Sequence, residues 1–459
     1  MKNVNSGYID DFNMILATDF YQLTMSAAYY QYNLENNINE YDEKATFELF
    51  TRQYPKNRNY LIFAGLEQAV YYLLNARFTE RTIEFLRKKE VFKNIDSSFY
   101  DVYLPNFKFN LNVWSMKEGD YFFPNEPIMR IQGPMIHAQL AETYLLNVIN
   151  YQTLVASKAS RVRNIAPNKV LLEFGTRRSH SPLAGVYAAR ASYIAGFDGT
   201  SNVIADLELG INSTGTMAHS FVQRFDNEIE SFNTYYDIYK ENSIFLIDTY
   251  DTEEGARKSC KFGNKIRGVR IDSGNLIDHA KKVRNILDKE GCDKVLIVAS
   301  SDLNEYKIKE ILDNKAPIDA FGIGTELATS RDDPTIPGVY KLIEYNGMPR
   351  IKVSEEKLTY PGVKQINRIF DKNGMLKEDI LVLDEEPEIP NSKSLLIPIM
   401  KEGKIIYKLP KIDEIRQYYL KNMETLPKGY KVLEENHLFK LKISKKLENL
   451  TQSLKGKYS

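Results

Sequence analysis

The sequence predicts an α/β protein built around an irregular (β/α) barrel, with a sheet-containing N-terminal domain and a smaller C-terminal domain. Short apolar runs alternate with helical stretches through the middle of the chain, most regularly between residues 268 and 323. This alternation indicates βαβ units with parallel strands. Segments 44–52 and 110–132, and the region after Gly338, show strand-like alternation broken by turns. We therefore expect three parts: residues 1–136, 137–338 and 339–459.

The central part offers seven candidate strands, at residues 170–174, 194–197, 211–216, 244–247, 268–272, 295–299 and 318–323. Parallel strands separated by helices in this number fit a barrel better than an open sheet. An open doubly wound sheet is the structural alternative. A helix between His137 and Ile165 is expected to lead into this part, because apolar residues recur there every three or four positions.

The composition excludes several functional classes. The 459 residues contain 61 Lys and Arg against 61 Asp and Glu, so the formal net charge is zero. Proteins that bind nucleic acid or acidic membranes usually carry a basic surplus. No apolar run reaches the roughly 20 residues of a membrane span, and no secretory signal pattern opens the chain. With two cysteines, too few for a disulfide framework, we expect a cytoplasmic protein without nucleic-acid or membrane partners.

Polar residues follow nearly every predicted strand of the central part. In a (β/α) barrel, such loops carry the reactive residues at one end. The loops are residues 175–180, 198–201, 215–220, 248–251, 270–274, 300–302 and 322–325. We expect them to converge on one mouth.

Several of these loops resemble anion sites. Loops 272–274 and 301–302 precede predicted helices, whose free backbone N–H groups favour phosphate. Loop 322–325 follows the seventh strand, where barrel enzymes often bind phosphate. The mouth also holds Arg177, Arg178 and Arg270, which suit bidentate binding of phosphate or carboxylate. Each loop taken alone is better interpreted as an ordinary capped helix, but together with the three arginines the loops predict an anionic ligand.

The segment 158–190 contains seven basic residues and a single acid, Glu173. We interpret this surplus as a surface that binds a small polyanion. His219 follows a Gly-Thr loop and could act as a general base or phosphoryl acceptor. Magnesium that accompanies a phosphate substrate would suit Asp248, Asp272 or Asp302. No P-loop or zinc-ligand pattern is present.

In seven segments, the chain resembles nicotinate phosphoribosyltransferases. The segments are residues 17–25, 173–178, 199–202, 215–221, 269–274, 322–325 and 338–342. Any one of them would be weak evidence, whereas all seven in order are specific. The resemblance implies a type II phosphoribosyltransferase fold and a homodimer with shared active sites.

The implied reaction joins nicotinate to phosphoribosyl pyrophosphate, giving nicotinate mononucleotide and pyrophosphate in NAD biosynthesis by salvage. It also implies Mg²⁺ and ATP as a co-substrate, with ATP hydrolysis coupled through a phosphohistidine. By motif match, His219 would be the phosphorylated residue.

The resemblance also assigns the substrate contacts residue by residue. Phe174 and Tyr21 of the partner subunit would sandwich the pyridine ring, with Thr216 and Arg270 near the nicotinate carboxylate. Ser201 stands where the similar nicotinamide-using enzyme has an aspartate, which favours the acid over the amide.

Further contacts would hold phosphoribosyl pyrophosphate. Asp272 and Asp302 would meet the ribose or the metal. The remaining ligands would be Arg177, Ser301, Gly324 and Thr325. The alternatives are a nicotinamide phosphoribosyltransferase, a quinolinate phosphoribosyltransferase, a catalytically silent homologue and a phosphate-binding barrel aldolase or isomerase.

Overall fold

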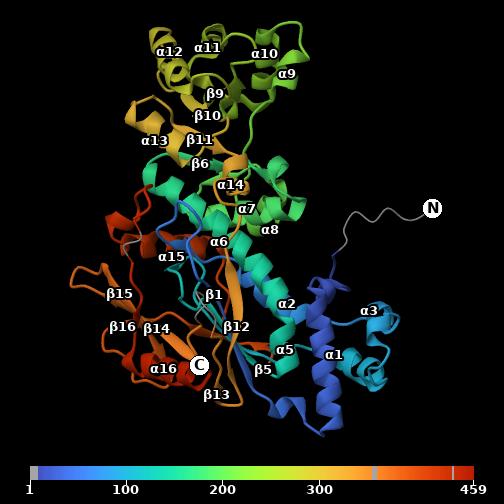
Figure 1. Cartoon of the computed structure of the whole chain (residues 1–459). Helices are drawn as coiled ribbons and strands as arrows, with labels where there is room; N and C mark the ends of the chain where they lie inside the picture. Colours follow the sequence, from blue (N-terminus) through green and yellow to red (C-terminus); the bar gives the residue numbers. More distant parts are fainter. Residues whose placement is uncertain (1–8, 354–358, 437–438, 459) are drawn as a thin grey trace.

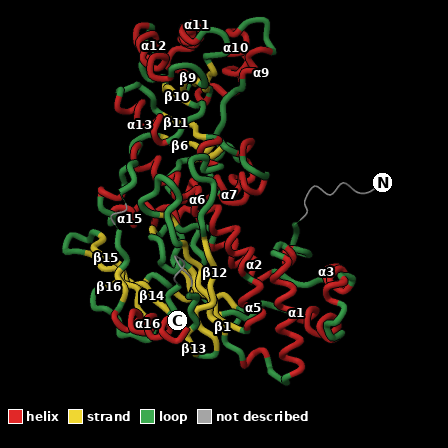
Figure 2. Tube along the Cα trace, in the orientation of Figure 1, coloured by secondary structure: helices red, strands yellow, loops and turns green. Residues whose placement is uncertain are grey.

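The computed structural model describes residues 9–353, 359–436 and 439–458. The molecule is elongated, with a parallel sheet at one end and a larger antiparallel sheet toward the other (Figure 1). Helices surround the parallel sheet, whereas in the opposite half strands lie on one side and helices on the other (Figure 2). Within the described ranges, no helix is both long and apolar enough to cross a membrane.

The antiparallel sheet draws on both ends of the chain. Its seven strands lie in the order β13-β12-β1-β5-β3-β17-β18. They are β1 (Ala45–Thr51), β3 (Asn112–Ser115), β5 (Met129–Gly133), β12 (Gly338–Tyr345), β13 (Met348–Pro349), β17 (Ile397–Lys401) and β18 (Lys404–Ile405). Every residue of β1 is buried between β5 and β12. Asn346 and Gly347 both have positive φ and join β12 to β13, as an Asn-Gly hairpin turn requires.

Helices pack around this sheet and lead to the parallel one. They are α1 (Phe20–Glu35), α2 (Leu66–Asn75), α3 (Glu80–Arg87), α4 (Leu104–Asn106), α5 (Met135–Leu140) and α6 (Glu142–Ile165). The predicted connector helix is thus α5 followed by α6. A two-stranded sheet of β2 (Leu61–Ile62) and β4 (Tyr121–Phe122) lies beside α6, which also contacts α7 and α13.

The second sheet is parallel and has six strands in the order β7-β6-β11-β10-β9-β8. They are β6 (Val170–Glu173), β7 (Gly199–Thr200), β8 (Ile244–Leu246), β9 (Gly268–Ile271), β10 (Leu296–Ala299) and β11 (Ala320–Ile323). The first and last of these along the chain, β6 and β11, pair with each other as in a barrel. The order still has two ends, so this sheet is not closed within the described residues, and the barrel expectation holds only as an open α/β sheet.

The sheet is open because two of the predicted strands do not form. Segment 194–197 is not a strand, because Ile194 ends α7 and Gly196 turns the chain with a φ of 95°. Segment 211–216 makes only one bridge, from Ser213 to Thr200. The edge beyond β7 therefore does not reach β8. The other five predicted strands are present, within one or two residues of their expected ends.

The helices of this half are α7 (Pro182–Ile194), α8 (Val203–Leu209), α9 (His219–Gln223), α10 (Glu228–Tyr239), α11 (Thr252–Ser259), α12 (Leu276–Lys289), α13 (Glu305–Asp313) and α14 (Thr325–Ala328). The C-terminal part adds a four-stranded sheet in the order β16-β14-β15-β19. Its elements are β14 (Lys364–Phe370), β15 (Leu376–Leu383), β16 (Ser392–Ser394), β19 (Lys442–Ile443), α15 (Ile412–Glu424) and α16 (Lys445–Tyr458). The domain limits 1–136, 137–338 and 339–459 stay predictions.

Candidate active site

A cavity of about 260 Å³ opens at the carboxyl ends of the parallel strands. Its walls come from the loops after β6, β9, β10 and β11, the strand ends where ligands bind in α/β folds. The lining residues are Phe174, Arg177, Arg178, Arg270, Asp272, Ser300, Ser301, Asp302, Gly322, Gly324 and Thr325. Eight of the residues assigned to substrates from the sequence therefore meet in one cavity.

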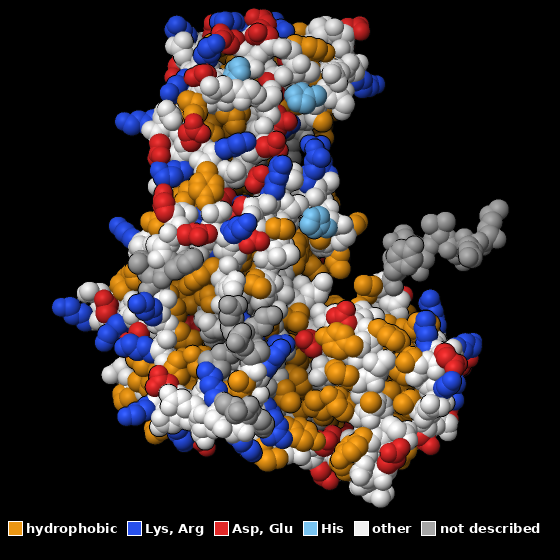
Figure 3. Space-filling model, viewed as in Figure 1, with side chains coloured by type: hydrophobic (Ala, Val, Ile, Leu, Met, Phe, Trp, Pro, Cys, Tyr) orange, Lys and Arg blue, Asp and Glu red, His pale blue; other side chains and the backbone are white. Residues whose placement is uncertain are grey.

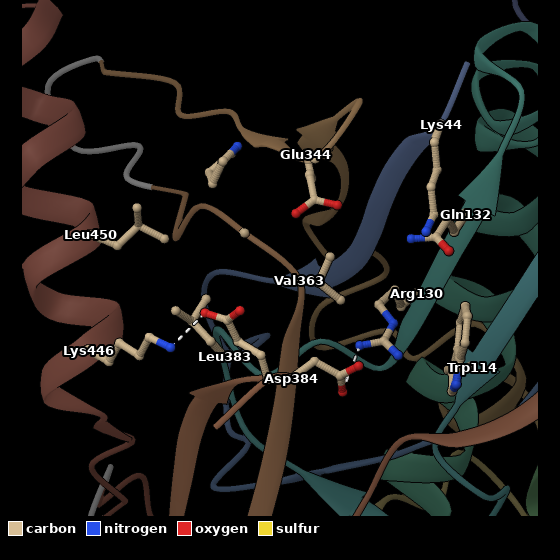
Figure 4. A pocket seen from close by; sticks show the side chains of 14 residues that line it. Lys44, Trp114, Arg130, Gln132, Glu344, Val363, Leu383, Asp384, Lys446 and Leu450 are labelled. Carbon is tan, nitrogen blue, oxygen red and sulfur yellow. Dashed lines mark ion pairs between the residues drawn. The ribbon is translucent and has the colours of Figure 1, made fainter. Parts of the chain in front are cut away.

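A larger cavity, of about 570 Å³, lies elsewhere, between the antiparallel sheet and α16 (Figure 4). Two of its basic side chains have acidic partners: Arg130 lies 3.1 Å from Asp384, and Lys446 lies 2.7 Å from Glu385. At the smaller cavity, Arg177 and Arg178 are exposed and form no ion pair within the described part of the chain. Unmatched guanidinium groups are what an anionic ligand requires, so we take the smaller cavity as the active site.

Arg270 projects from the end of β9 and is held on three sides. Its Nη1 donates to Asp272 Oδ1 at 3.0 Å and to Ser300 Oγ at 2.9 Å, and its Nη2 donates to Met217 O at 2.9 Å. Burial lowers the pKa of Arg270, while Asp272 and Asp248 raise it. Its Nε is buried without a partner. The guanidinium is therefore fixed in place, with its Nε–H unused.

His219 begins α9 and lies beside the same acid. Its Nε2 is 3.7 Å from Asp272 Oδ2, and its Nδ1 is 3.1 Å from the hydroxyl of Thr249. The imidazole is 41% exposed, so a ligand can reach it. His219 does not line the cavity itself. The structure thus places it next to the cavity wall through Asp272.

Asp248 supports the loop after β9. Its Oδ2 accepts hydrogen bonds from Asp272 N at 2.8 Å and from Ser273 Oγ at 2.6 Å. Its Oδ1 is buried and has no hydrogen-bond partner. No group of three or more His, Cys, Asp or Glu side chains able to hold a metal occurs in the described ranges. Mg²⁺ commonly takes one or two carboxylates together with water and substrate phosphates, which Asp248 and Asp272 could supply.

The loops expected to bind phosphate at helix N-termini, 272–274 and 301–302, differ in part from that prediction. Asn275 caps α12 by accepting from Ile277 N and Asp278 N, and Asn304 caps α13 by accepting from Lys307 N. Loops 272–274 and 301–302 therefore do not lead straight into their helices as expected, because an asparagine stands before each helix and accepts from one or two of its first N–H groups. Ser301 itself has a φ of 122°, a strained conformation that is typical of functional sites.

Phe174 forms one wall of the cavity and lies against two glycines. A Cβ on Gly322 would be 2.4 Å from the Phe174 ring, and one on Gly324 would be 3.1 Å from Phe174 O. Phe174 N donates to Ile323 O at 2.8 Å. The glycines of loop 322–325 therefore make room for this aromatic ring.

Three of the residues assigned to nicotinate lie away from the cavity lining. Ser201 follows β7 and donates its N–H to Glu173 O at 2.9 Å. Thr216 donates to Met217 O, the carbonyl that also accepts from Arg270. Tyr21 is on α1, at the other end of the elongated molecule from β9 and β10, and 48% of it is exposed (Figure 1).

The surplus of basic residues in segment 158–190 is mostly not at the mouth. Lys158 pairs with Glu305 and Asp332, Arg161 with Glu305, Arg163 with Asp198, and Arg190 with Glu67 and Glu118. The interpretation of this surplus as one polyanion surface is wrong for these four side chains, since acids from distant segments neutralise them. Only Arg177 and Arg178 reach the cavity.

Glu173 is a buried acid next to the cavity that charge counting overlooked. It ends β6, is completely buried and lies directly behind Phe174 and Gly175. Burial raises the pKa of its carboxyl to about 7, although hydrogen bonds from Thr200 and Gly175 lower it. A single acid at a strand end within a basic segment was the signal that could have identified it.

The fold and this cavity define an α/β protein with an arginine-lined cavity, suited to an anionic ligand, at the carboxyl end of a parallel sheet. Family models of nicotinate phosphoribosyltransferases match the chain in three parts: the N-terminal domain over residues 16–150, the central family region over 170–362 and the C-terminal domain over 391–451. The chain belongs to the nicotinate phosphoribosyltransferase family.

Individual relatives match over nearly the whole chain. A nicotinate phosphoribosyltransferase of Mycobacterium tuberculosis is 38% identical, covering 92% of this chain and 89% of its own. That of Bacillus subtilis is 36% identical, covering 95% and 94%. The crystal structure of human nicotinic acid phosphoribosyltransferase superposes with a TM-score of 0.84 at 27% identity, covering 95% of this chain and 99% of its own. A nicotinate-nucleotide pyrophosphorylase from Pyrococcus furiosus gives 0.74 at 27%, covering 92% and 99%.

Proposed function

We propose that the protein is a nicotinate phosphoribosyltransferase that forms nicotinate mononucleotide and pyrophosphate in NAD salvage. The observation that carries this function is the cavity in which the unpaired Arg177 and Arg178 face Asp272, Asp302 and the loop of Gly324. The family membership and the names of relatives over nine-tenths of the chain support the same reaction. A cytoplasmic location stays a prediction from the sequence.

The charges at the cavity suit phosphoribosyl transfer. Breaking the bond from ribose C1 to pyrophosphate builds positive charge on the sugar and negative charge on the leaving group, so a preorganised site needs carboxylates near the ribose and cations at the pyrophosphate. Asp272 and Asp302 would supply the carboxylates, and Arg177 the cation. Ser301 would contact the same substrate, and Gly324 and Thr325 would meet the 5′-phosphate.

Nicotinate would bind against Phe174, whose ring already lines the cavity. Arg270 is fixed by three hydrogen bonds and still has N–H groups without a partner among the described residues, which suits a carboxylate ligand. Thr216 and Ser201 would lie nearby. Because Ser201 has no charge, it does not repel the carboxylate of nicotinate as an aspartate would.

A second copy of the chain would complete the ring sandwich. Four large apolar side chains of α1 are exposed, namely Phe20, Tyr21, Tyr32 and Leu34. Hydrophobic side chains gather over the part of the surface that includes α1 (Figure 3). Exposed apolar surface of this kind marks protein interfaces. Since Tyr21 is remote from the cavity of its own chain, Tyr21 of the partner subunit would reach the pyridine ring in a homodimer.

ATP would be the co-substrate through His219. The γ-phosphoryl group would pass from ATP to the imidazole, releasing ADP, and water would later remove it as phosphate. Thr249 and Asp272 orient the ring from its two nitrogens. A phosphoryl group adds roughly −1.5 to −2 charge, if it behaves as on other side chains, and would reposition the neighbouring Arg270. Mg²⁺ would accompany the phosphates, with Asp248 Oδ1 as an available acceptor.

The experiment that tests the function is a substrate comparison. The protein is incubated with phosphoribosyl pyrophosphate, Mg²⁺ and ATP, and with nicotinate, nicotinamide or quinolinate separately, while mononucleotide formation is followed. We expect turnover with nicotinate. Equal or faster turnover of nicotinamide would assign the alternative amide-using enzyme. The lining residues include no lysine, which argues against a Schiff-base aldolase.

The phosphohistidine role has its own test. His219→Ala is expected to lose ATP hydrolysis while retaining slow phosphoribosyl transfer, because the transfer site itself stays intact. Thr249→Val serves as a milder variant that removes only the hydroxyl at Nδ1. ATP coupling that survives in His219→Ala would refute the role of this residue.

A further inference from the structure

Glu173 closes a ring of hydrogen bonds behind the cavity. Its Oε1 accepts from Gly175 N, and its Oε2 accepts from Thr200 Oγ1 at 2.7 Å. Thr200 Oγ1 in turn accepts from Asn202 N at 3.0 Å, and Asn202 Nδ2 donates to Thr176 Oγ1 at 3.3 Å. The ring therefore links the loop that carries Arg177 to the loop that carries Ser201.

The space beside Glu173 admits no side chain at Gly175. A Cβ on Gly175 would lie 2.7 Å from Glu173 Oε1, 2.5 Å from Ala328 Cβ and 3.0 Å from Gly324 O. The hydrogen bond from Gly175 N to the carboxyl therefore holds the start of the loop Thr176–Arg178 close to the loop of Gly324. Both loops line the cavity.

No cation pairs with this carboxyl within the described ranges. The charged or titratable groups on the elements around it are Tyr151 of α6, Arg177 and Arg178 of the following loop, Arg190 of α7 and Glu326 of α14. Arg190 is paired with Glu118, and Glu326 with Arg331. Tyr151 donates to Ala328 O at 2.8 Å and is uncharged at neutral pH, since burial and Glu173 raise its pKa. With a pKa of about 7, Glu173 is itself divided between its two protonation states.

We propose that Glu173 is a positioning residue that holds the arginine-bearing loop at the mouth and takes up a proton from solvent when a polyanion binds there. The ligand's negative charge would arrive on the other side of Phe174 and Gly175 from the buried carboxyl. It therefore disfavours the ionised carboxyl. Protonation preserves the ring of hydrogen bonds, because a carboxylic acid can donate to the Thr200 hydroxyl while its other oxygen accepts from Gly175 N.

The proposal rests on the proposed function only for the expectation that the ligand is a polyanion. A ligand that raises the Glu173 pKa by about one unit would cause an uptake of about half a proton midway between the two pKa values. The same linkage makes affinity for the anion fall by up to about tenfold as the pH rises through this range.

Calorimetric binding of inorganic pyrophosphate tests the proton uptake. The titration is run near pH 7.5 in buffers of different ionisation enthalpy, with wild type and Glu173→Gln. Pyrophosphate titrates in this range too, but its contribution is common to both proteins. We expect wild type to take up about half a proton more per bound pyrophosphate than Glu173→Gln, which resembles the protonated acid. Equal uptake by the two proteins would overturn the proposal.

A second pair of variants tests the ring and keeps the proposal falsifiable if Glu173→Gln does not fold. Thr200→Val removes the hydroxyl that lowers the Glu173 pKa, so the pH of maximal proton uptake should rise, and KM for phosphoribosyl pyrophosphate should increase about tenfold. Thr200→Ser should restore both values. A Thr200→Val protein with wild-type uptake and KM would contradict the role. Absence of nicotinate turnover by wild type would refute the proposed function but leave the pyrophosphate titration valid.

Discussion

Two clusters of basic and acidic residues in this molecule have similar composition and opposite character. Behind the parallel sheet, Lys158 lies 3.0 Å from Glu305 and 2.8 Å from Asp332, while Arg58 and Arg161 complete the cluster at 2.7 and 3.0 Å. Glu305 is completely buried. At the mouth, Arg177 and Arg178 are exposed and unpaired within the described residues. Charges matched inside the chain stabilise structure, whereas unmatched charges at a cavity await a ligand.

The two regions also differ in how they bind protons. In the buried cluster, burial acts to raise the pKa of Glu305 and Asp332, but the charges of Lys158 and the arginines outweigh it and hold both pKa values below their usual range. Glu173, behind the mouth, has no such cation, so burial dominates and its pKa rises to about 7. Desolvation raises the pKa of all three acids, and the presence of a paired cation decides whether the net pKa shift is downward.

The largest expected effect breaks the buried cluster. Glu305→Ala leaves Lys158 and Arg161 buried without their partner, so we expect it to lower the free energy of unfolding by about 3–5 kcal/mol. Urea denaturation measures the loss. Glu310→Ala, an exposed acid on the same helix, is the matched control and should change stability by no more than about 0.5 kcal/mol. Similar losses for the two variants would contradict the distinction between the regions.

The next effect concerns pH. Because the folded pKa of Glu173 is raised from its ordinary value of 4.5 to about 7, its contribution to stability is fully present below pH 4.5 and is lost as the pH rises through 7. The difference amounts to about 3 kcal/mol. Glu305 and Asp332 have lowered pKa values, so their contribution is lost as the pH falls below the unfolded values.

Urea midpoints of wild type and Glu173→Gln across pH 4 to 9 measure this difference. The buffers contain no phosphate, because a bound anion would itself raise the Glu173 pKa. We expect the variant to lose less stability than wild type between pH 4.5 and 7, while both lose stability in acid. Parallel curves over the neutral range would show that Glu173 does not titrate there.

The third prediction compares two arginines of the same basic segment. Arg177→Ala should raise KM for phosphoribosyl pyrophosphate about 10- to 100-fold by removing a charge-assisted hydrogen bond, and leave the urea midpoint unchanged. Arg163→Ala should do the reverse, since Arg163 bonds to Asp198 at 2.6 Å and to Gly196 O at 2.9 Å. We expect it to lose about 1–3 kcal/mol of stability with KM unaltered. Steady-state kinetics and denaturation of both proteins provide the check, and matching behaviour would contradict it.

These differences show what the sequence could and could not predict. The run from β9 to β11 was predicted correctly, because buried parallel strands are continuous apolar runs and amphipathic helices separate them. The rule that strand ends carry the site correctly grouped Phe174, Arg177, Asp272 and Gly324. The prediction of strands at segments 194–197 and 211–216 was wrong, because short apolar runs also occur at helix ends and in buried loops.

The ion-pair partners of these arginines could not be predicted from the sequence, for a physical reason. Arg161 meets Glu305 across 144 positions of the chain, and Arg190 meets Glu67 across 123. A count of charges within one segment includes the arginines but not their acidic partners, which lie far away in the sequence. It therefore predicted a polyanion surface where the fold places ion pairs, and it left Glu173 as an isolated acid without a role.

The antiparallel sheet has a consequence for biosynthesis. β1 lies between β5 and β12, and β3 between β5 and β17, so the sheet needs residues up to Lys401 before both of these strands have two neighbours. On the ribosome, the N-terminal strands therefore wait for most of the chain with their edges open, a state prone to aggregation. A gene truncated before Gly338 would yield an N-terminal portion that cannot complete its sheet, and chaperone dependence should decline only once β17 has emerged.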